Sequence, residues 1–286
     1  MAGMNSKTIL VTGATGNLGR AVVEALRKDG FKVKAGSTNP QKTAWPPGVE
    51  AVKVVYEEPN TIDEALKETQ GIFLVAPPLD PDAPAKLMPV IDKAKSAFVG
   101  HIVFVSALGV DQNEQAPLRI IERHLMGSGM SYTILRPNFF MENFSTGFIA
   151  PMIAQGGIFL AAGDGKTSFI STADIADAAA HAFKRVSTGV EYNLTGPNAL
   201  DHTEVARILS DVSGKDIKYF SLTEEAMLKG ARDGGMPEGA VQYLATLYGV
   251  VRNGWMATIT EDVLRVTGKS PIPFVEFARK NASAWK

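Results

Sequence analysis

A chain of 286 residues, of which 45% are hydrophobic, is long enough to bury a large core and too apolar to be disordered. Its formal net charge of −1 gives no bulk attraction to nucleic acid or to an anionic membrane, so neither partner is expected. The absence of cysteine excludes disulfides, thiolate catalysis and cysteine-bound metal centres. Without signal-peptide features or a long apolar span, we expect a cytoplasmic protein.

The first half of the chain alternates short β-branched runs with amphipathic stretches. The runs IFLVA and IVFVS are almost continuously apolar, which is typical of central strands that helices cover on both faces. In chain order we predict strands over 8–12, 32–36, 49–55, 72–76, 101–106 and 132–135, and helices over 18–28, 62–68 and 87–97. Strands that alternate with helices pair in parallel through crossover connections. This order predicts an α/β fold with a doubly wound parallel sheet of the Rossmann type.

The rhythm changes after residue 135. Residues 139–153 are rich in aromatic side chains and methionine, and residues 161–168 are rich in glycine. A helix is predicted over 172–182, with Thr172 as its N-cap. The remaining elements that we expect are strands over 192–194 and 217–220 and a helix over 203–212, followed mostly by helix.

A glycine-rich segment, TILVTGATGNLGRAVVEAL, places three glycines between a strand and a helix in the spacing G-x-x-G-x-x-G. Gly13 allows the tight turn, Gly16 lets the backbone approach a pyrophosphate, and Gly19 lets the helix pack closely on the sheet. The free N–H groups at the start of the helix would then bind the phosphates. A glycine-rich turn without a ligand is the alternative. The dinucleotide-binding residues that we predict here are Gly13, Thr15, Gly16, Asn17, Leu18 and Gly19.

The end of the second strand decides which dinucleotide binds, because NAD-binding proteins usually place an acidic residue there for the ribose hydroxyls. Residues 30–49 contain no Asp or Glu, whereas Ser37, Thr38 and Lys42 can hydrogen-bond to a 2′-phosphate or neutralise it. An ordinary solvated lysine is the alternative interpretation of Lys42. The sequence therefore favours NADP(H), and NAD(H) stays open because no arginine is present in this segment.

We predict two parts of the chain on this basis. Residues 1–190 form the dinucleotide-binding Rossmann domain, with 139–156 contributing to the substrate pocket. Residues 191–286 form a smaller, mostly helical lobe that covers the substrate. The sequence leaves the oligomeric state open, a homodimer included, and the four histidines show no metal-ligand spacing, so no metal is expected.

Motifs spread over almost the whole chain carry a resemblance to a known family. The most diagnostic is SGMSYTILRPNFFMENF, and the others are TGATGNLGR, FLVAPP, HIVFVSALGVD, GDGKTSFISTADIADAAA and VARILSDVSGKDIKYF. With these motifs the chain resembles the NmrA-like branch of the atypical short-chain dehydrogenases/reductases. Members of that branch include NAD(P)H quinone reductases, triphenylmethane dye reductases and azoreductases, and others act as redox-sensing regulators.

The resemblance implies further contacts for the cofactor and the substrate. It places Ala76, Pro77 and Pro78 beside the inner ribose of the cofactor. It also places Pro137, Asn138 and Phe139 near the nicotinamide. Ser106, at the end of the fifth strand, matches the substrate-orienting serine of the family and is the candidate catalytic residue, although a serine that only caps a turn fits equally well.

The catalytic pair of ordinary short-chain dehydrogenases is missing. In that pair, Tyr-x-x-x-Lys on a helix, the lysine lowers the pKa of the tyrosine so that the tyrosine exchanges a proton with a substrate oxygen. None of the six tyrosines has a lysine four residues later, and Leu118 and Glu122 occupy the equivalent positions. We therefore expect acceptors that take up hydride readily, such as quinones, azo dyes and other electron-poor planar compounds.

An aromatic segment and one tryptophan are the candidates for binding a planar aromatic substrate. Aromatic faces stack on such a guest, but an aromatic stripe at helical spacing is more often core than pocket. The substrate-binding residues that we predict are Phe140, Asn143, Phe144 and Trp255. Two functions stay open, an NADPH-dependent reductase of such compounds and a non-catalytic NAD(P)-binding redox sensor, while an epimerase is disfavoured by the missing pair.

Overall fold

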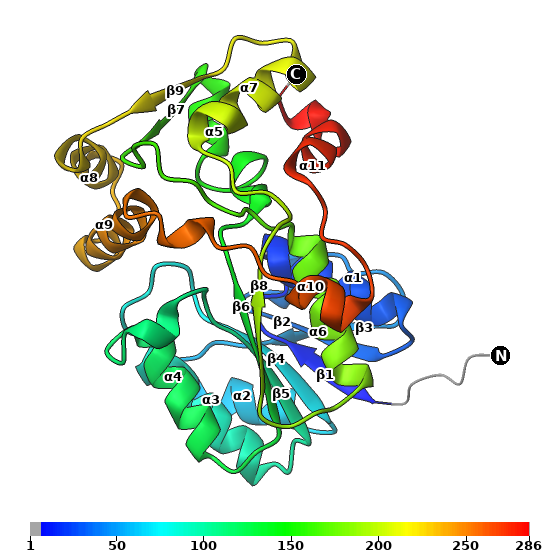
Figure 1. The fold of residues 1–286 in the computed structure, drawn as a ribbon. Helices are drawn as coiled ribbons and strands as arrows, with labels where there is room; N and C mark the ends of the chain where they lie inside the picture. The colour runs from blue at the N-terminus through cyan, green and yellow to red at the C-terminus, as the bar shows by residue number, and fades with distance from the viewer. Residues whose placement is uncertain (1–6, 286) are drawn as a thin grey trace. The chain divides into compact units, whose positions relative to one another are not determined.

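The computed structural model describes residues 7–285 (Figure 1). Contacts within the chain divide it into two compact units, which are described separately. The first unit holds the chain up to Pro78, Asp82–Arg136 and Ile175–Asn193. The second unit holds Leu79–Pro81, Pro137–Asp174 and Leu194–Lys286. Residues 137–174 thus group with the C-terminal part of the chain, whereas the sequence analysis placed its boundary at residue 190.

The first unit is built on a seven-stranded sheet in the order β3-β2-β1-β4-β5-β6-β8. The neighbouring pairs from β3 to β6 are parallel, and the strand order reverses between β1 and β4. The strands are β1 (Thr8–Val11), β2 (Lys32–Ser37), β3 (Val49–Lys53), β4 (Gly71–Val75), β5 (His101–Val105), β6 (Tyr132–Pro137) and β8 (Val190–Leu194). The prediction of a doubly wound parallel sheet is confirmed.

Helices cover both faces of this sheet because the central strands are apolar on both sides; β5, for example, is buried at every position. One apolar cluster joins α2, α3 and α4 to strand residues such as Leu10, Ile72 and Phe104. On α6, the ring of Phe183 packs edge-on against His101 and Phe31. The helical elements are α1 (Asn17–Lys28), η1 (Pro40–Lys42), α2 (Pro59–Leu66), α3 (Ala83–Ser96), η2 (Val110–Gln112), α4 (Pro117–Gly127) and α6 (Thr172–Lys184).

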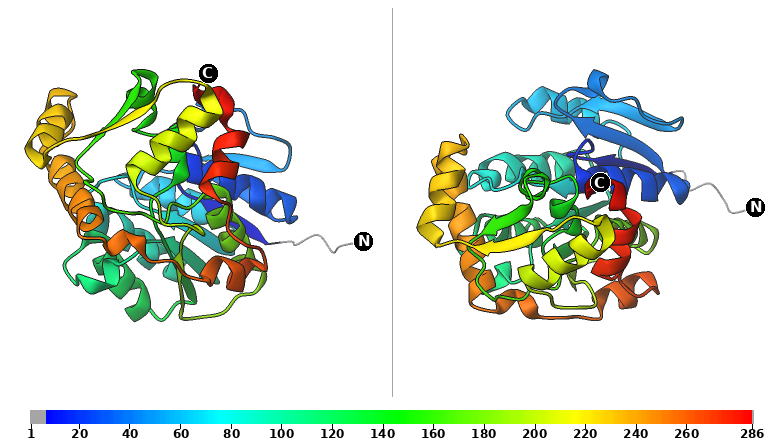
Figure 2. Two further views of the ribbon diagram at one scale, coloured as in Figure 1. Left: turned by 45° about the horizontal axis from the view of Figure 1, so that its top comes forward. Right: turned by 90° about the horizontal axis from the view of Figure 1, so that it is seen from above.

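The second unit is mostly helical and contains a two-stranded parallel sheet of β7 (Gly157–Leu160) and β9 (Lys218–Ser221), which Figure 2 shows from two directions. The rings of Phe159 and Phe220 stack across these strands, with centroids 4.8 Å apart. The other elements are η3 (Met141–Phe144), α5 (Ala150–Ala154), α7 (His202–Ser213), α8 (Glu224–Asp233), α9 (Glu238–Arg252), η4 (Trp255–Ala257), α10 (Asp262–Thr267), α11 (Phe274–Lys280) and η5 (Ala282–Trp285). No helix within residues 7–285 is long and apolar enough to cross a bilayer.

The start of α6 differs from the prediction by one residue. The sequence analysis assigned Thr172 as the N-cap, but the helix already begins at Thr172. The Ser171 hydroxyl accepts a hydrogen bond from the Ala173 N–H at 3.2 Å, which is the bond that an N-cap side chain makes. The N–H of Thr172 donates to the Glu142 carboxylate at 3.0 Å instead. Ser171 therefore caps the helix. The sequence pattern could not distinguish Ser171 from Thr172, because serine and threonine both serve as N-caps.

Two buried histidines, one in each unit, are neutral at physiological pH. His101 is hydrogen-bonded through both ring nitrogens to Ser131 and Thr133, and burial lowers its pKa to about 4. His202 lies among aromatic rings of the second unit, and burial likewise lowers its pKa to about 4. Protonation of either ring would place an uncompensated charge in the core.

We expect the free energy of unfolding to decrease as the pH falls from 7 to 5. In the unfolded chain these histidines take up protons near pH 6.5, whereas in the folded protein they stay neutral until about pH 4. Each histidine therefore lowers the free energy of unfolding by about 2 kcal/mol between pH 7 and pH 5. Urea unfolding at several pH values measures the effect, and His101→Asn and His202→Phe should each flatten the profile. A wild-type profile that is flat or rises toward pH 5 would contradict it.

Candidate functional site

The three glycines that follow β1 have different structural roles. Gly13 adopts φ of +60°, the left-handed region that favours glycine. A Cβ on Gly19 would overlap the carbonyl oxygen of Gly13 and lie 2.7 Å from the Cα of Ala14. A Cβ on Gly16 would meet only the Gly13 oxygen, at 3.4 Å, which is ordinary contact. Gly13 and Gly19 are therefore required by the fold of the turn, whereas the protein itself does not fill the space beside Gly16.

The N-terminus of α1 points its backbone N–H groups toward this space. Gly16 is the N-cap of the helix, and no side chain caps it. The first turn contains no acidic residue, so the partial positive charge of the helix end is not neutralised locally. An uncapped helix N-terminus beside an unfilled backbone position is the arrangement that binds a phosphate group.

Hydrogen bonds tie this turn to the ends of the neighbouring strands. The Ala14 N–H donates to the Gly36 carbonyl at the end of β2, at 3.0 Å. The Thr12 hydroxyl donates to the Phe73 carbonyl at 3.2 Å and accepts from the Val75 N–H at 3.0 Å, at the end of β4. The carboxyl ends of β1, β2 and β4 therefore form one surface, which lies at the reversal of strand order where doubly wound sheets bind their ligands.

The residues predicted at the end of β2 follow Gly36, whose carbonyl accepts a hydrogen bond from the glycine turn. Ser37 is buried, and its hydroxyl has no hydrogen-bond partner within residues 7–285. Thr38 is exposed, and Lys42 is exposed at the end of η1. A buried hydroxyl without a partner costs free energy, and such a group is explained when a ligand supplies the missing bond. Contact of Ser37, Thr38 and Lys42 with a 2′-phosphate stays a prediction.

The predicted residues after β4 and β5 lie at the same edge of the sheet. Ala76 and Pro77, directly after β4, are half-buried, and Pro78 is exposed. Ser106 follows β5 and is buried, and its N–H donates to the Leu135 carbonyl at 2.8 Å. Four adjacent strands, β2, β1, β4 and β5, therefore end in predicted residues at the same edge of the sheet.

A buried ion cluster is centred on Glu122 of α4. Glu122 is fully buried and accepts hydrogen bonds from Arg136 to both carboxylate oxygens, at 2.8 Å, and from Arg119 at 2.8 Å. Arg136 also pairs with Glu191 at 2.5 Å. Burial by itself would raise the pKa of Glu122, but hydrogen bonds from Arg136, Ser106 and Arg119 outweigh burial and hold the pKa below its ordinary value. Glu122 is therefore a carboxylate at neutral pH and has no proton to donate.

The arginine partners of Glu122 were not singled out from the sequence. Their pairing joins α4 to the end of β6 and to β8, over separations that a local pattern does not reveal. The one signal in the sequence is that an acidic and two basic residues occupy positions that the helix and strand patterns predict to be buried, where charged residues are rare unless they are paired.

The candidates from the second unit divide into polar and aromatic residues. Asn138 is buried, and its amide nitrogen donates to Ser168 at 2.7 Å and to the Met256 carbonyl at 2.8 Å, while its oxygen accepts from the Phe139 N–H. Its side chain thus joins three segments of the unit. Pro137 is the last residue of β6, and Asn143 is half-buried after it.

The aromatic candidates differ in exposure. Phe144 has no exposed surface and packs against Phe169, His202 and Phe274, which is the core alternative that the sequence analysis left open. Phe139 and Phe140 are half-buried. Trp255 is 62% exposed, at the start of η4. Of the predicted aromatic residues, Phe144 thus offers no surface to a ligand in this structure, and Trp255 offers the most.

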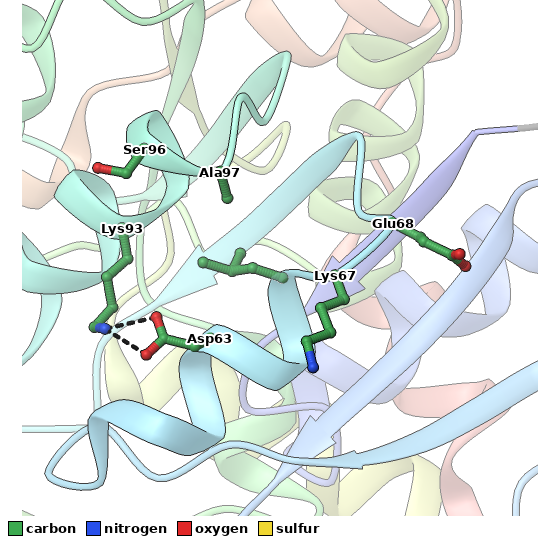
Figure 3. A pocket seen from close by; sticks show the side chains of 7 residues that line it. Asp63, Lys67, Glu68, Lys93, Ser96 and Ala97 are labelled. Atoms are coloured by element: carbon green, nitrogen blue, oxygen red, sulfur yellow. Dashed lines mark hydrogen bonds and ion pairs between the residues drawn. The ribbon is translucent and has the colours of Figure 1, made fainter.

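A polar hollow lies at the opposite edge of the first unit's sheet, where α2 and α3 end before β4 and β5 begin (Figure 3). Lys93 pairs across it with Asp63 at 2.6 Å. The residues that line it are Asp63, Leu66, Lys67, Glu68, Lys93, Ser96 and Ala97. This hollow lies at the amino ends of the strands, so it is separate from the edge that carries the glycine turn.

One family model and several relatives match most of this chain. The model of the NmrA-like family matches residues 5–257. Prestalk A differentiation protein A of Dictyostelium discoideum is 32% identical over 96% of this chain and 93% of that protein, and the NAD(P)H azoreductase of Xenophilus azovorans is 31% identical over 97% and 99%. The solved structure of an NADPH-dependent quinone oxidoreductase from Escherichia coli in complex with NADPH covers 95% of this chain and 99% of that chain, at 28% identity and a TM-score of 0.82. The chain belongs to the NmrA-like family.

Proposed function

We propose that this protein is a cytoplasmic NADPH-dependent reductase that transfers hydride to an electron-poor planar acceptor, such as a quinone or an azo compound. The observation that carries the proposal is the uncapped N-terminus of α1 beside Gly16, at the carboxyl edge of a doubly wound sheet. The names of two relatives, an NAD(P)H azoreductase and an NADPH-dependent quinone oxidoreductase, support the reaction class.

The residues at this edge fit a dinucleotide. The helix N-terminus of α1 suits the pyrophosphate, because its N–H groups have no side-chain acceptor. The Ser37 hydroxyl, which has no partner within residues 7–285, suits a polar group at the end of β2. When bound, the dinucleotide supplies the hydride. The assignments of Ala76, Pro77 and Pro78 to the ribose, and of Pro137, Asn138 and Phe139 to the nicotinamide end, stay predictions.

We argue the acceptor class from the missing Tyr-x-x-x-Lys pattern and from the protonation states of Tyr56 and Glu122. No tyrosine has the lysine partner that lowers its pKa. Burial raises the pKa of Tyr56 to about 12, and its hydroxyl is committed to the Val75 carbonyl at the end of β4. Hydrogen bonds from Arg136 and Arg119 hold the pKa of Glu122 below its ordinary value, so Glu122 is ionised at neutral pH. A reduction that needs no simultaneous proton transfer suits this site, and quinones and azo compounds give products that water can protonate.

Ser106 can orient the acceptor through its hydroxyl at the end of β5. We expect Ser106→Ala to lower kcat/KM for a quinone by about 2- to 10-fold, because one neutral hydrogen bond contributes about 0.5–1.5 kcal/mol. Steady-state kinetics measures the change, and an unaltered melting temperature is the control for folding. A loss of about 1000-fold would show that Ser106 carries an essential proton transfer, which this mechanism does not contain.

A panel of acceptors tests the proposed function. Purified protein is mixed with NADPH and, one at a time, with quinones, azo dyes and triphenylmethane dyes, and the loss of the near-ultraviolet absorbance of NADPH is followed. We expect turnover with at least one class, and no turnover with simple aldehydes or ketones, which need a proton as they accept hydride. Tight binding of NADPH without consumption by any acceptor would overturn the proposal and favour a redox-sensing regulator.

A further inference from the structure

Arg20 and Trp45 form a pair beside the glycine turn that the sequence motifs do not explain. Arg20 lies in the first turn of α1, and its guanidinium carbon lies 5.6 Å from the centroid of the Trp45 ring. Its Nε donates to the carbonyl oxygen of Thr15, at 3.1 Å. These two contacts hold the guanidinium against the turn, and within residues 7–285 no acidic side chain pairs with it. The Nη donors of Arg20 are therefore available to an anion.

The Arg20–Trp45 pair is linked to the end of β2 by short connections. Thr15, which accepts the bond from Arg20, follows Ala14, and the Ala14 N–H donates to the Gly36 carbonyl at 3.0 Å. Ser37 comes next in the chain, and it is 7% exposed with no partner for its hydroxyl. The end of the second strand is where a Rossmann site meets the ribose 2′ position.

The surroundings of this pair favour a negative group. No acidic residue occurs from residue 30 to residue 49, a stretch that contains Ser37, Lys42 and Trp45. The nearest acidic residue on α1 after the turn, Glu24, is already paired with Arg27 at 2.9 Å. The indole N–H of Trp45 is buried and has no hydrogen-bond partner among residues 7–285, so it is a further unused donor in the cluster. An adenosine carrying a 2′-hydroxyl alone would leave this excess of positive charge and donors uncompensated.

We infer that Arg20, positioned by Trp45, binds the 2′-phosphate of NADPH and replaces the arginine that the end of β2 lacks. A guanidinium matches a phosphate through two parallel hydrogen bonds, and the contact with the indole fixes the orientation of its plane. Arg20 is then the residue that determines the preference for NADPH over NADH, and Trp45 is a positioning residue. This inference rests on the proposed binding of a dinucleotide at the glycine turn.

Calorimetric titration of NADPH and NADH at one fixed ionic strength tests the inference. We expect Arg20→Gln to raise the Kd for NADPH by about 10- to 100-fold, as for the loss of a charge-assisted hydrogen bond, and to change the Kd for NADH by less than about 3-fold. Arg20→Lys should lose less affinity for NADPH than Arg20→Gln. Trp45→Leu should raise the Kd for NADPH by a smaller factor than Arg20→Gln and leave the Kd for NADH unchanged. Arg27→Gln, on the same helix but paired with Glu24, is the matched control and should alter neither affinity.

Two further arms separate the possible outcomes. Adenosine 2′,5′-bisphosphate should bind more tightly than adenosine 5′-monophosphate to the wild-type protein, and Arg20→Gln should reduce that difference by about 10-fold or more. Equal losses for NADPH and NADH, or no loss for either, would overturn the role of Arg20. If the wild-type protein bound neither dinucleotide, the proposed function itself would fail. If the wild type bound both and Arg20→Gln changed the two affinities equally, only the role of Arg20 would fail.

Discussion

Gly16→Val is expected to raise the Kd for NADPH by at least about 100-fold while the protein stays folded. Gly16 has φ of −76° and ψ of 169°, an extended conformation that valine adopts without strain. Its added Cβ would meet only the Gly13 oxygen, at 3.4 Å. The valine methyl groups would instead occupy the space beside the N-terminus of α1, where we place the pyrophosphate. Calorimetry measures the affinity, and thermal unfolding verifies the fold.

Gly19→Ala provides the contrast to this variant. Its Cβ would lie 2.7 Å from the Ala14 Cα and would overlap the Gly13 carbonyl, so the turn itself must move. We expect Gly19→Ala to lower the melting temperature, whereas Gly16→Val should melt close to the wild type. If Gly16→Val bound NADPH as tightly as the wild type, the pyrophosphate would have to lie elsewhere.

Glu122→Gln is expected to lower the free energy of unfolding by about 3–5 kcal/mol. Glu122 is fully buried and compensates two arginines, Arg119 and Arg136, which are 7% and 4% exposed. Removal of the carboxylate leaves two buried, positively charged guanidinium groups without the negative charge that pairs with both of them. Urea unfolding at neutral pH measures the loss. Equal unfolding midpoints for the variant and the wild type would contradict the role of this cluster.

The pH dependence of this variant gives a second measurement. Because the pKa of Glu122 is lowered in the folded protein, its stabilising contribution is present above the ordinary pKa of a glutamate and is lost as the pH falls below it. The difference between the wild type and Glu122→Gln should therefore shrink in acid. Glu114→Gln is the matched control, since Glu114 binds Arg119 from the exposed end of the same cluster, and it should unfold close to the wild type.

The parts of the fold that sequence reasoning predicted are those with local signals. The glycine spacing between a strand and a helix placed the turn after β1, and the apolar runs placed β4 and β5 in the middle of the sheet. The strand β7 was not predicted, because Gly157–Leu160 pairs with residues 218–221 far along the chain. Such a strand is stabilised by its distant partner and by the stacked rings of Phe159 and Phe220, which leave no periodic pattern.

The candidate site shows the same distinction. Gly16, Ser37 and Ser106 could be placed at the carboxyl edge of the sheet because they lie at the ends of predicted strands. An aromatic composition could not separate the buried Phe144 from the exposed Trp255, because both burial classes satisfy the same local pattern. Contacts such as that between Arg20 and Trp45 join segments whose proximity only the folded chain defines.

A single-turnover reaction tests the central claim most directly. Protein holding one equivalent of NADPH is mixed with excess menadione, a naphthoquinone, in the absence of oxygen, and the absorbance of the bound NADPH is followed. If this protein is a reductase that uses a dinucleotide on the glycine turn, all of the bound NADPH is oxidised in one phase, and Gly16→Val shows no such phase. Bound NADPH that stays reduced with this quinone and with every other acceptor class would contradict the account.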